Sequence, residues 1–157
     1  QPDIRVKLMF VVKEVHVLLI RKKTGIGKGK INGPGGKMEP GETPLECALR
    51  ETEEELGIRV AGAVEMGELS FSFRCGTTPE IHGYVFLAGD YDGTPMETRE
   101  GAPLWVPLDE IPYDEMWEDD RYWLPRMLEG RKFRARFIFE RDRMLAKDVV
   151  LTDHENE

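Results

Sequence analysis

The chain has 157 residues, of which 22 are Lys or Arg and 30 are Asp or Glu, so its formal net charge at pH 7 is −8. This balance argues against a nucleic-acid polymer as partner, because phosphate backbones bind basic surfaces. No apolar run is long enough to cross a membrane, and no signal peptide is visible. The length fits one domain, which we expect over residues 1–152, with an acidic tail over 153–157.

Cysteine usage favours a reducing, cytoplasmic setting. Cys47 and Cys75 lack the spacing of a metal site, and the three histidines are scattered. Cys47 falls on the glutamate side of a predicted helix. It is either a small residue that fills space in the core or a thiol influenced by the neighbouring glutamates. The filler is the better interpretation.

Strand patterns occupy most of the chain, and two segments have a helical pattern. The second helix contains Pro125, an awkward interior residue that can kink it. Helices beside several strands favour a mixed α/β architecture. In chain order, strands are expected at 4–12, 15–21, 64–74, 81–87, 104–106, 134–140 and 146–150, and helices at 44–56 and 120–128.

A loop rich in glycine and basic residues is expected over residues 21–37, which contain no acidic residue. Glycine lets the backbone approach a ligand closely, and lysine supplies a point charge for phosphate. It is not a Walker loop, because Met38 follows Lys37 where Ser or Thr is needed. For residues 25–30 alone, a solvated hairpin loop is an equally good interpretation.

Capping signals delimit the first helix. Thr43 is suited to the N-cap, Pro44 to the first helical position, and Glu46 completes a capping box. Gly57 stands where a left-handed residue is expected to end the helix. The expected apolar face consists of Leu45, Ala48, Leu49, Thr52 and Leu56.

Three glutamates of this helix, Glu51, Glu54 and Glu55, lie beside the apolar face. Glu51 and Glu55 form a like-charge i, i+4 pair that costs about 0.2–0.5 kcal/mol. They also lie in the C-terminal half, where the helix dipole disfavours anions. A bound Mg2+ explains this placement, because that cation takes carboxylate oxygens. The alternative is that the glutamates only solvate an exposed helix.

Residues 36–58 match the pattern G-x5-E-x7-R-E-U-x-E-E-x-G-U, in which U is a bulky apolar residue. By this pattern the chain resembles the Nudix hydrolases, which cleave a nucleoside diphosphate linked to another group. Thr52 replaces the first apolar residue and is the single departure. The matching positions are Gly36, Glu42, Arg50, Glu51, Glu54, Glu55, Gly57 and Ile58.

The resemblance implies an α/β/α sandwich with a mixed sheet flanked by helices, and a Mg2+ site in which Mn2+ can substitute. Glu51, Glu54 and Glu55 are the implied metal ligands, together with the carbonyl of Gly35. Glu100 matches a loop glutamate that joins metal binding or acts as a base. Metal ions would neutralise the diphosphate and lower the pKa of a bound water.

Four further residues acquire roles from the resemblance. Arg50 matches the arginine that orients the catalytic glutamates. Glu42 matches the glutamate that supports the loop or assists the attacking water. Lys22 and Lys37 are assigned to substrate binding.

Beyond this motif the chain resembles the MutT branch, and within it the vertebrate-type oxidised purine nucleoside triphosphatases. The resemblance implies that Asn32, Asp119 and Asp120 read the purine edge, that Trp117 stacks on the base, and that Phe73 binds substrate. Two neighbouring buried carboxyls would favour a proton on one of them. The similar segments are 22–27, 31–37, 71–73, 93–97, 108–113 and 116–123.

Several of these pocket residues also fit ordinary structural roles. Trp117 and Trp123 could be core residues, and Asp119 or Asp120 could be only a helix N-cap. Phe71 and Phe73 alternate with serines as in an ordinary strand. The chain also departs from the vertebrate pattern: Ile26, Ile31 and Pro34 replace aromatic residues, Ile81 replaces a methionine, and Lys7 stands where a small hydroxyl residue faces the base.

We therefore expect a monomeric, Mg2+-dependent enzyme that acts on a small nucleotide and releases a monophosphate and pyrophosphate, with an oxidised purine preferred. A second hypothesis is a Nudix hydrolase of a dinucleoside polyphosphate, ADP-ribose or a nucleotide sugar. A third is a non-catalytic module that binds nucleotide. The complete glutamate set argues against the third.

Overall fold

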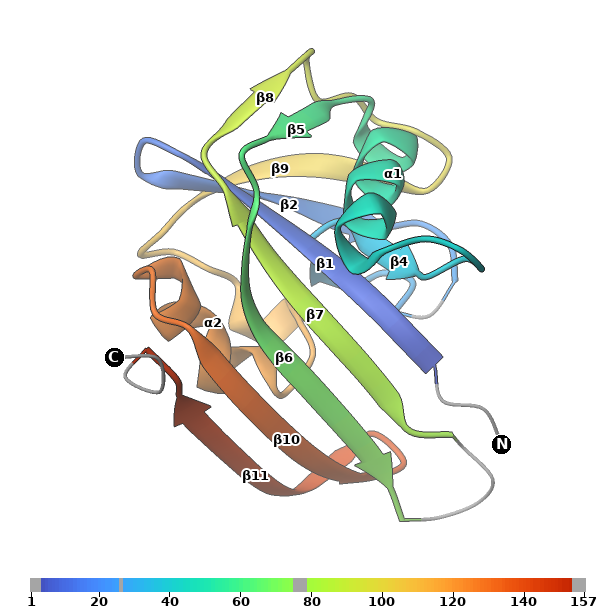
Figure 1. The fold of residues 1–157 in the computed structure, drawn as a ribbon, viewed down its shortest axis with the longest axis vertical. Coiled ribbons are helices and arrows are strands. Elements are labelled where there is room, and N and C mark those ends of the chain that lie inside the picture. Colours follow the sequence, from blue (N-terminus) through green and yellow to red (C-terminus); the bar gives the residue numbers. More distant parts are fainter. Residues whose placement is uncertain (1–3, 26, 75–78, 154–157) are drawn as a thin grey trace.

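The computed structural model describes residues 4–25, 27–74 and 79–153, so Ile26, Cys75 and His154 lie outside the described residues. A nine-stranded sheet forms the centre in the order β11-β10-β6-β7-β1-β2-β3, with β4 on β1 and β9 on β2 (Figure 1). The strands are β1 Ile4–Lys13, β2 His16–Lys22, β3 Ile31–Asn32, β4 Gly35–Lys37, β5 Arg59–Ala61, β6 Val64–Phe73, β7 Ile81–Ala88, β8 Asp90–Asp92, β9 Gly101–Pro107, β10 Phe133–Glu140 and β11 Arg143–Leu151. The helices are α1 Pro44–Leu56, the 3-10 turn η1 Tyr113–Glu115 and α2 Asp120–Leu128.

The sheet is mixed. β1 pairs with β7, and β6 with β10, in parallel, whereas the other pairs in the sheet are antiparallel. β5 and β8 form a separate antiparallel pair beside α1 (Figure 1). No helix in the described part of the chain is long and apolar enough to span a bilayer.

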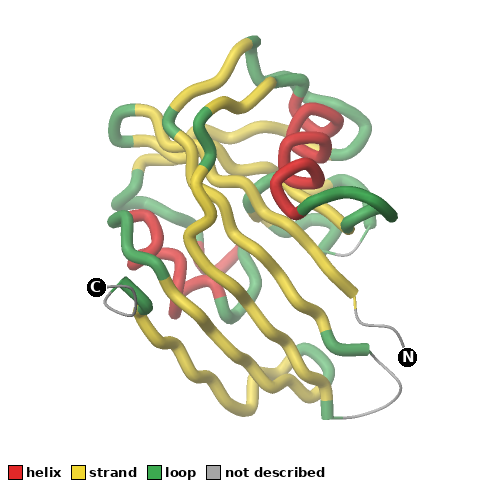
Figure 2. The backbone as a smooth tube through the Cα atoms, viewed as in Figure 1, coloured by secondary structure: helices red, strands yellow, loops and turns green. Residues whose placement is uncertain are grey.

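The two α-helices cover opposite faces of the sheet, because successive side chains of a strand point to opposite faces. On β1, Met9 and Val11 belong to a buried cluster that includes Ala48 and Leu56 of α1. Phe10, between them, belongs to the cluster around α2. Figure 2 shows the two helices against different parts of the sheet. The expected mixed sheet flanked by helices is confirmed.

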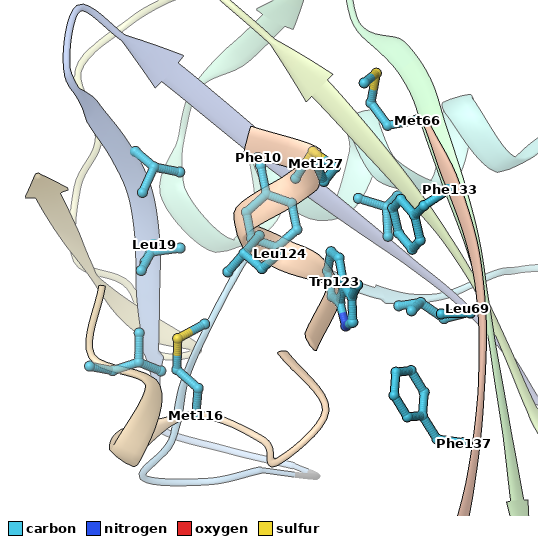
Figure 3. Close-up of a cluster of buried hydrophobic side chains, with 14 of the residues drawn as sticks. Phe10, Leu19, Met66, Leu69, Met116, Trp123, Leu124, Met127, Phe133 and Phe137 are labelled. Carbon is cyan, nitrogen blue, oxygen red and sulfur yellow. The ribbon is translucent and has the colours of Figure 1, made fainter. Parts of the chain in front are cut away.

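The larger cluster surrounds Trp123 of α2, which is completely buried. Its ring packs edge-on against Phe10 at 5.9 Å between centroids and stacks on Phe133 at 5.1 Å. Figure 3 shows Trp123 among these rings, with Leu124 and Met127 on the same helix. The core interpretation of Trp123 is therefore correct, and this packing fixes the N-terminus of α2.

The expected loop over residues 21–37 is partly wrong, because it contains β3 and β4. Strands of two or three residues show no alternation, so their sequence carries no strand signal. β4 fits only because Gly35 lacks a side chain: an added Cβ would lie 1.9 Å from the carbonyl oxygen of Lys7. β5 and β8 were not predicted either, because they also have only three residues each.

The first residue of the expected tail is held in place. Asp153 accepts hydrogen bonds from Arg131 Nε at 2.5 Å and from the backbone N–H of Lys132 at 2.8 Å. The rest of the expected tail, 154–157, lies outside the described residues.

Candidate active site

The caps of α1 are as predicted. Thr43 Oγ1 accepts a hydrogen bond from the N–H of Glu46 at 3.1 Å, and Glu46 Oε1 accepts one from the N–H of Thr43 at 2.8 Å. Gly57 is left-handed, with φ of 74°, and its N–H donates to the carbonyl of Glu53. These caps fix both ends of the helix that carries the glutamates.

The buried face of α1 differs from the expected apolar stripe. Leu45 is 38% exposed, whereas Cys47 and Glu55 are buried. Thr52 is fully buried, and its hydroxyl donates to the carbonyl of Ala48 at 2.8 Å, so it packs in place of the expected apolar residue. Cys47 is a buried filler whose pKa burial raises to about 11, so it is not a reactive thiol.

Three carboxylates converge where α1 faces the loop before β9. Glu51, Glu55 and Glu100 each place an oxygen within 4.8 Å of the others. Two glycines of β4 make room for them. An added Cβ on Gly36 would lie 2.5 Å from Cδ of Glu51, and the N–H of Gly35 donates to Glu55 Oε1 at 2.7 Å.

The electrostatics of this cluster favour a bound cation. Burial raises the pKa of Glu55 to about 7, while the Gly35 N–H and Lys22 oppose that rise. Burial also raises the pKa of Glu51, against the effect of Arg50. Three adjacent carboxylates with little access to water are costly unless a positive charge joins them. Their hard oxygen ligands fit a divalent cation such as Mg2+.

Arg50 links the glutamates to the preceding loop. Its Nε and Nη2 donate to the two oxygens of Glu42 at 2.5 and 3.0 Å, and Nη1 donates to Glu51 at 2.8 Å. Nη2 also donates to the carbonyl of Lys37 at 3.2 Å. The guanidinium lowers the pKa of Glu42 to about 2 and fixes the orientation of Glu51.

Glu54 lies apart from the carboxylate cluster. Its side chain is 51% exposed and accepts a hydrogen bond from Arg50 Nη1 at 3.2 Å. The side chain of Lys37 is exposed. Metal binding by Glu54 and by the carbonyl of Gly35, and substrate binding by Lys22 and Lys37, remain predictions.

Glu100 owes its place to a residue that the sequence did not single out. The hydroxyl of Thr98 donates to the carbonyl of Glu55 at 2.7 Å and accepts from the N–H of Glu100 at 3.2 Å. The N–H of Met96 donates to the carbonyl of Leu56 at 2.9 Å, which ties the same loop to the end of α1. The spacing T-x-E was present, but nothing in it points to a helix 43 residues earlier in the chain.

On the other face of the sheet, two aspartates are buried at the start of α2. Asp119 is the N-cap residue, but its side chain makes no capping bond and instead accepts from Trp123 Nε1 at 2.9 Å. Asp120 Oδ2 is buried and has no hydrogen-bond partner among the described residues. The capping interpretation is therefore wrong for Asp119, and Asp120 has a free polar atom.

Burial dominates the protonation of this pair. It raises the pKa of Asp119 to about 6, with the Trp123 hydrogen bond acting in the opposite direction. Burial and the neighbouring Asp119 carboxyl raise the pKa of Asp120 well above its ordinary value. The pair can thus hold a proton near neutral pH and present a donor as well as acceptors.

The remaining predicted base-binding residues come from three segments. Trp117 is half-buried beside Gly27 and Lys30 of the β2–β3 hairpin. Asn32, at the end of β3, accepts a hydrogen bond from the N–H of Gly33 at 2.8 Å through its Oδ1. Phe73 is partly buried and packs against Phe139 at 6.1 Å, on the α2 side of the sheet.

The expectation that Lys7 faces the base is wrong. Lys7 is fully buried on the α1 side of the sheet, with its Nζ 4.4 Å from the ring centroid of Tyr84. Desolvation lowers its pKa. Because β1 sends Lys7 to the same face as Met9, its side chain lies on the opposite face of the sheet from the cluster around α2. Ile31 is also buried, in the core cluster with Met116.

Two surface hollows lie away from the carboxylate cluster. One of about 260 Å³ lies over β6, β10 and β11 and is lined by residues that include Ser70, Arg136 and Asp148. Another of about 250 Å³ lies between α1 and β5 and includes Arg50 and Glu53. Neither contains Glu51, Glu55 or Glu100.

Comparison with known proteins agrees with this geometry. The profile of the NUDIX domain family matches residues 4–127. Proteins of Danio rerio and Mus musculus named oxidized purine nucleoside triphosphate hydrolase are each 41% identical over 133 residues, which cover 85% of this chain and 85% of each relative. The crystal structure of a MutT protein from Bacillus halodurans superposes with a TM-score of 0.83 at 30% identity, covering 93% of this chain and 97% of that one. The chain therefore belongs to the Nudix hydrolase family.

Proposed function

We propose that this protein hydrolyses oxidised purine nucleoside triphosphates to a nucleoside monophosphate and pyrophosphate, with Mg2+ as cofactor and Mn2+ as a substitute. The carboxylate cluster of Glu51, Glu55 and Glu100 supports the hydrolysis. The buried pair with a free Asp120 oxygen supports the choice of a polar base edge. The relatives named for this activity support the oxidised purine.

At the phosphate end, Glu51, Glu55 and Glu100 would hold the cation. A cation held there would supply positive charge for the phosphates and would lower the pKa of a bound water. Arg50 holds Glu51 in place through a 2.8 Å hydrogen bond. Glu42, with a pKa near 2, is too weak a base to take a proton efficiently near neutral pH, so its contacts favour the loop-supporting role.

At the base end, Asp119 and Asp120 would read the purine edge, and Trp117 would cover the base. Asp119 is already oriented by Trp123, which leaves the free oxygen of Asp120 to meet the base. Asn32 and Phe73 complete the proposed pocket. In a cell, this activity would remove oxidised nucleotides from the pool before DNA synthesis, and we propose that it acts there as a cytoplasmic monomer.

The test is pyrophosphate release with Mg2+ over a substrate panel, with nucleotide products also scored. The panel holds the four common deoxynucleoside triphosphates, 8-oxo-dGTP, 2-hydroxy-dATP, ADP-ribose and a dinucleoside polyphosphate. We expect the highest kcat/KM on one of the two oxidised purines. Turnover of ADP-ribose or the dinucleoside polyphosphate alone would keep the hydrolase chemistry and reject the proposed base pocket.

A matched pair of variants separates the site from the helix that carries it. Glu51→Gln removes a carboxylate of the cluster, whereas Glu53→Gln changes an exposed residue of the same helix that pairs with Arg59 at 2.8 Å. We expect only the first to lose activity. Equal activity of both variants would exclude Glu51 from the reaction.

A further inference from the structure

The hairpin between β2 and β3 contacts the segment that carries the base-reading residues. We call its residues 27–30 the hairpin tip. Gly27 packs against the indole of Trp117 so closely that an added Cβ would lie 3.3 Å from its Nε1 and Cζ2 atoms. Nζ of Lys30 lies 5.0 Å from the centroid of the same ring, within cation–π range. The tip therefore touches Trp117 through backbone and through charge.

Arg21, at the base of the hairpin, connects the tip to the same segment. Its Nη1 donates to the carbonyl of Gly29 at 3.0 Å, and its Nη2 donates to Glu115 at 2.7 Å. Ile31 and Met116 are buried in one core cluster just behind these contacts. The Arg21 hydrogen bonds and the packing of Ile31 near Met116 thus hold the hairpin against the segment that carries Trp117.

The tip also carries a positive charge that acts on the buried Asp120. The charged or titratable groups that act on the pair are Lys30 of the tip, Tyr113 of η1 and Glu118. Of these, Lys30 is the cation. Its electric field favours the ionised form of Asp120, but it is a small effect beside burial and Asp119, which raise the pKa of that carboxyl. Lys28, on the same tip, has an exposed side chain, and its backbone N–H donates to the carbonyl of Gly25 at 3.2 Å.

We propose that Lys30 is a specificity-determining residue for the proposed base pocket: its ammonium lies against the Trp117 indole and holds that ring where it would cover the base. The inference rests on the proposed function. An ionised carboxylate binds a purine edge that presents N–H donors, whereas a protonated carboxyl can also bind an edge that presents a carbonyl. By opposing the proton that burial favours on Asp120, the charge of Lys30 would shift the balance of the pocket towards donor-bearing edges.

The test compares Lys30→Met, which keeps the length of the side chain and removes the charge, with Lys30→Arg, which keeps the charge. Lys28→Met is the control for loss of charge on the same tip. The first readout is Trp117 fluorescence of the substrate-free protein, isolated by subtracting the spectrum of Trp117→Phe. The second is the pH profile of kcat/KM on 8-oxo-dGTP and on 2-hydroxy-dATP.

For Lys30→Met we expect altered Trp117 emission and an acidic limb moved to higher pH, because loss of a neighbouring cation makes the carboxylate harder to form. The ratio of kcat/KM values for the two substrates should change by about two- to fivefold, the size of one exposed cation–π contact. Lys30→Arg and Lys28→Met should match the wild type. If Lys30→Met matches Lys28→Met in both readouts, the inference is wrong.

The two proposals fail in distinguishable ways. A wild-type protein that hydrolyses neither oxidised purine overturns the proposed function, and the fluorescence comparison then decides whether Lys30 holds the indole. A wild-type protein that does hydrolyse them, with an unchanged substrate ratio and pH profile in Lys30→Met, overturns only the role of Lys30. Unfolding of Lys30→Met is detected by near-UV circular dichroism, and Lys30→Gln then replaces it.

Discussion

The two ends of the proposed site are built differently. At the phosphate end, Arg50 binds Glu42 and Glu51 within one helix and the loop before it, and the glutamates remain partly accessible. At the base end, Asp119 and Asp120 are buried, and Asp119 is bonded to Trp123 of the same helix. The neighbouring Trp117 lies against Gly27 and Lys30 of a distant hairpin. The contacts of Arg50 at the phosphate end therefore join sequence neighbours, whereas those of Trp117 at the base end join distant segments. Changes at the two ends should therefore differ in kind.

The largest effect is expected at the phosphate end, from Glu55→Gln. This change removes a carboxylate of the cluster, so activity should fall by about 10²–10³-fold, the usual loss when one charge-stabilising group is removed. The thermal unfolding temperature should stay equal or rise, because burial already opposes ionisation of Glu55. Steady-state kinetics and calorimetry with Glu53→Gln as control measure both, and a large loss of stability would contradict this view of the cluster.

Glu54→Gln tests whether Glu54 belongs to the set of metal ligands. We expect it to remove most activity while the fold stays intact, as the motif implies, although Glu54 is half exposed and bonded to Arg50. A loss as large as that of Glu55→Gln would require Glu54 to turn towards the cation during the reaction. Activity equal to the wild type would remove Glu54 from the set of metal ligands.

At the base end, the expected effect is on stability against pH. The folded-state pKa of Asp119 is raised from 3.8 to about 6, so folding is favoured most below the unfolded value and loses stability as pH rises through about 6. Across this window the wild type should lose more stability than Asp119→Asn, which has no carboxyl to ionise at this position. Urea unfolding of both proteins from pH 4 to pH 7 measures the difference. If the free energies of unfolding of the two proteins change in parallel with pH, the pKa of Asp119 is not raised in the folded state.

A smaller effect is expected from Thr98, which joins Glu55 to Glu100. Thr98→Val keeps the shape and removes the hydroxyl, so binding of Mn2+ should weaken by about 10-fold, as when a group that orients metal ligands is lost. Thr98→Ser should restore it. Isothermal titration with Mn2+ in the absence of substrate is the measurement, and equal weakening in both variants would contradict this role, because the hydroxyl of Ser would then fail to restore binding.

Much of the fold could be predicted because its signals are local. The caps of α1, the long strands and α2 were expected, and the structure contains all of them. The short strands β3, β4, β5 and β8 were not, because segments of two or three residues are too short to show an alternating pattern. The apolar face of α1 was only partly correct: periodicity suggested Leu45, but the sheet buries Cys47 and Glu55.

The sequence by itself determined the reaction class, because the spacing of Glu42, Arg50, Glu51 and Glu55 within one loop and helix already places these groups together. Only the tertiary structure decided that Glu100 joins Glu51 and Glu55, and that Thr98 holds it there. It also decided that Lys7 lies on the α1 side of the sheet, against Tyr84, since the side of a sheet on which a strand residue lies depends on what packs there. Contacts between distant segments depend on how the strands pair and pack, and the residues of one segment do not specify them.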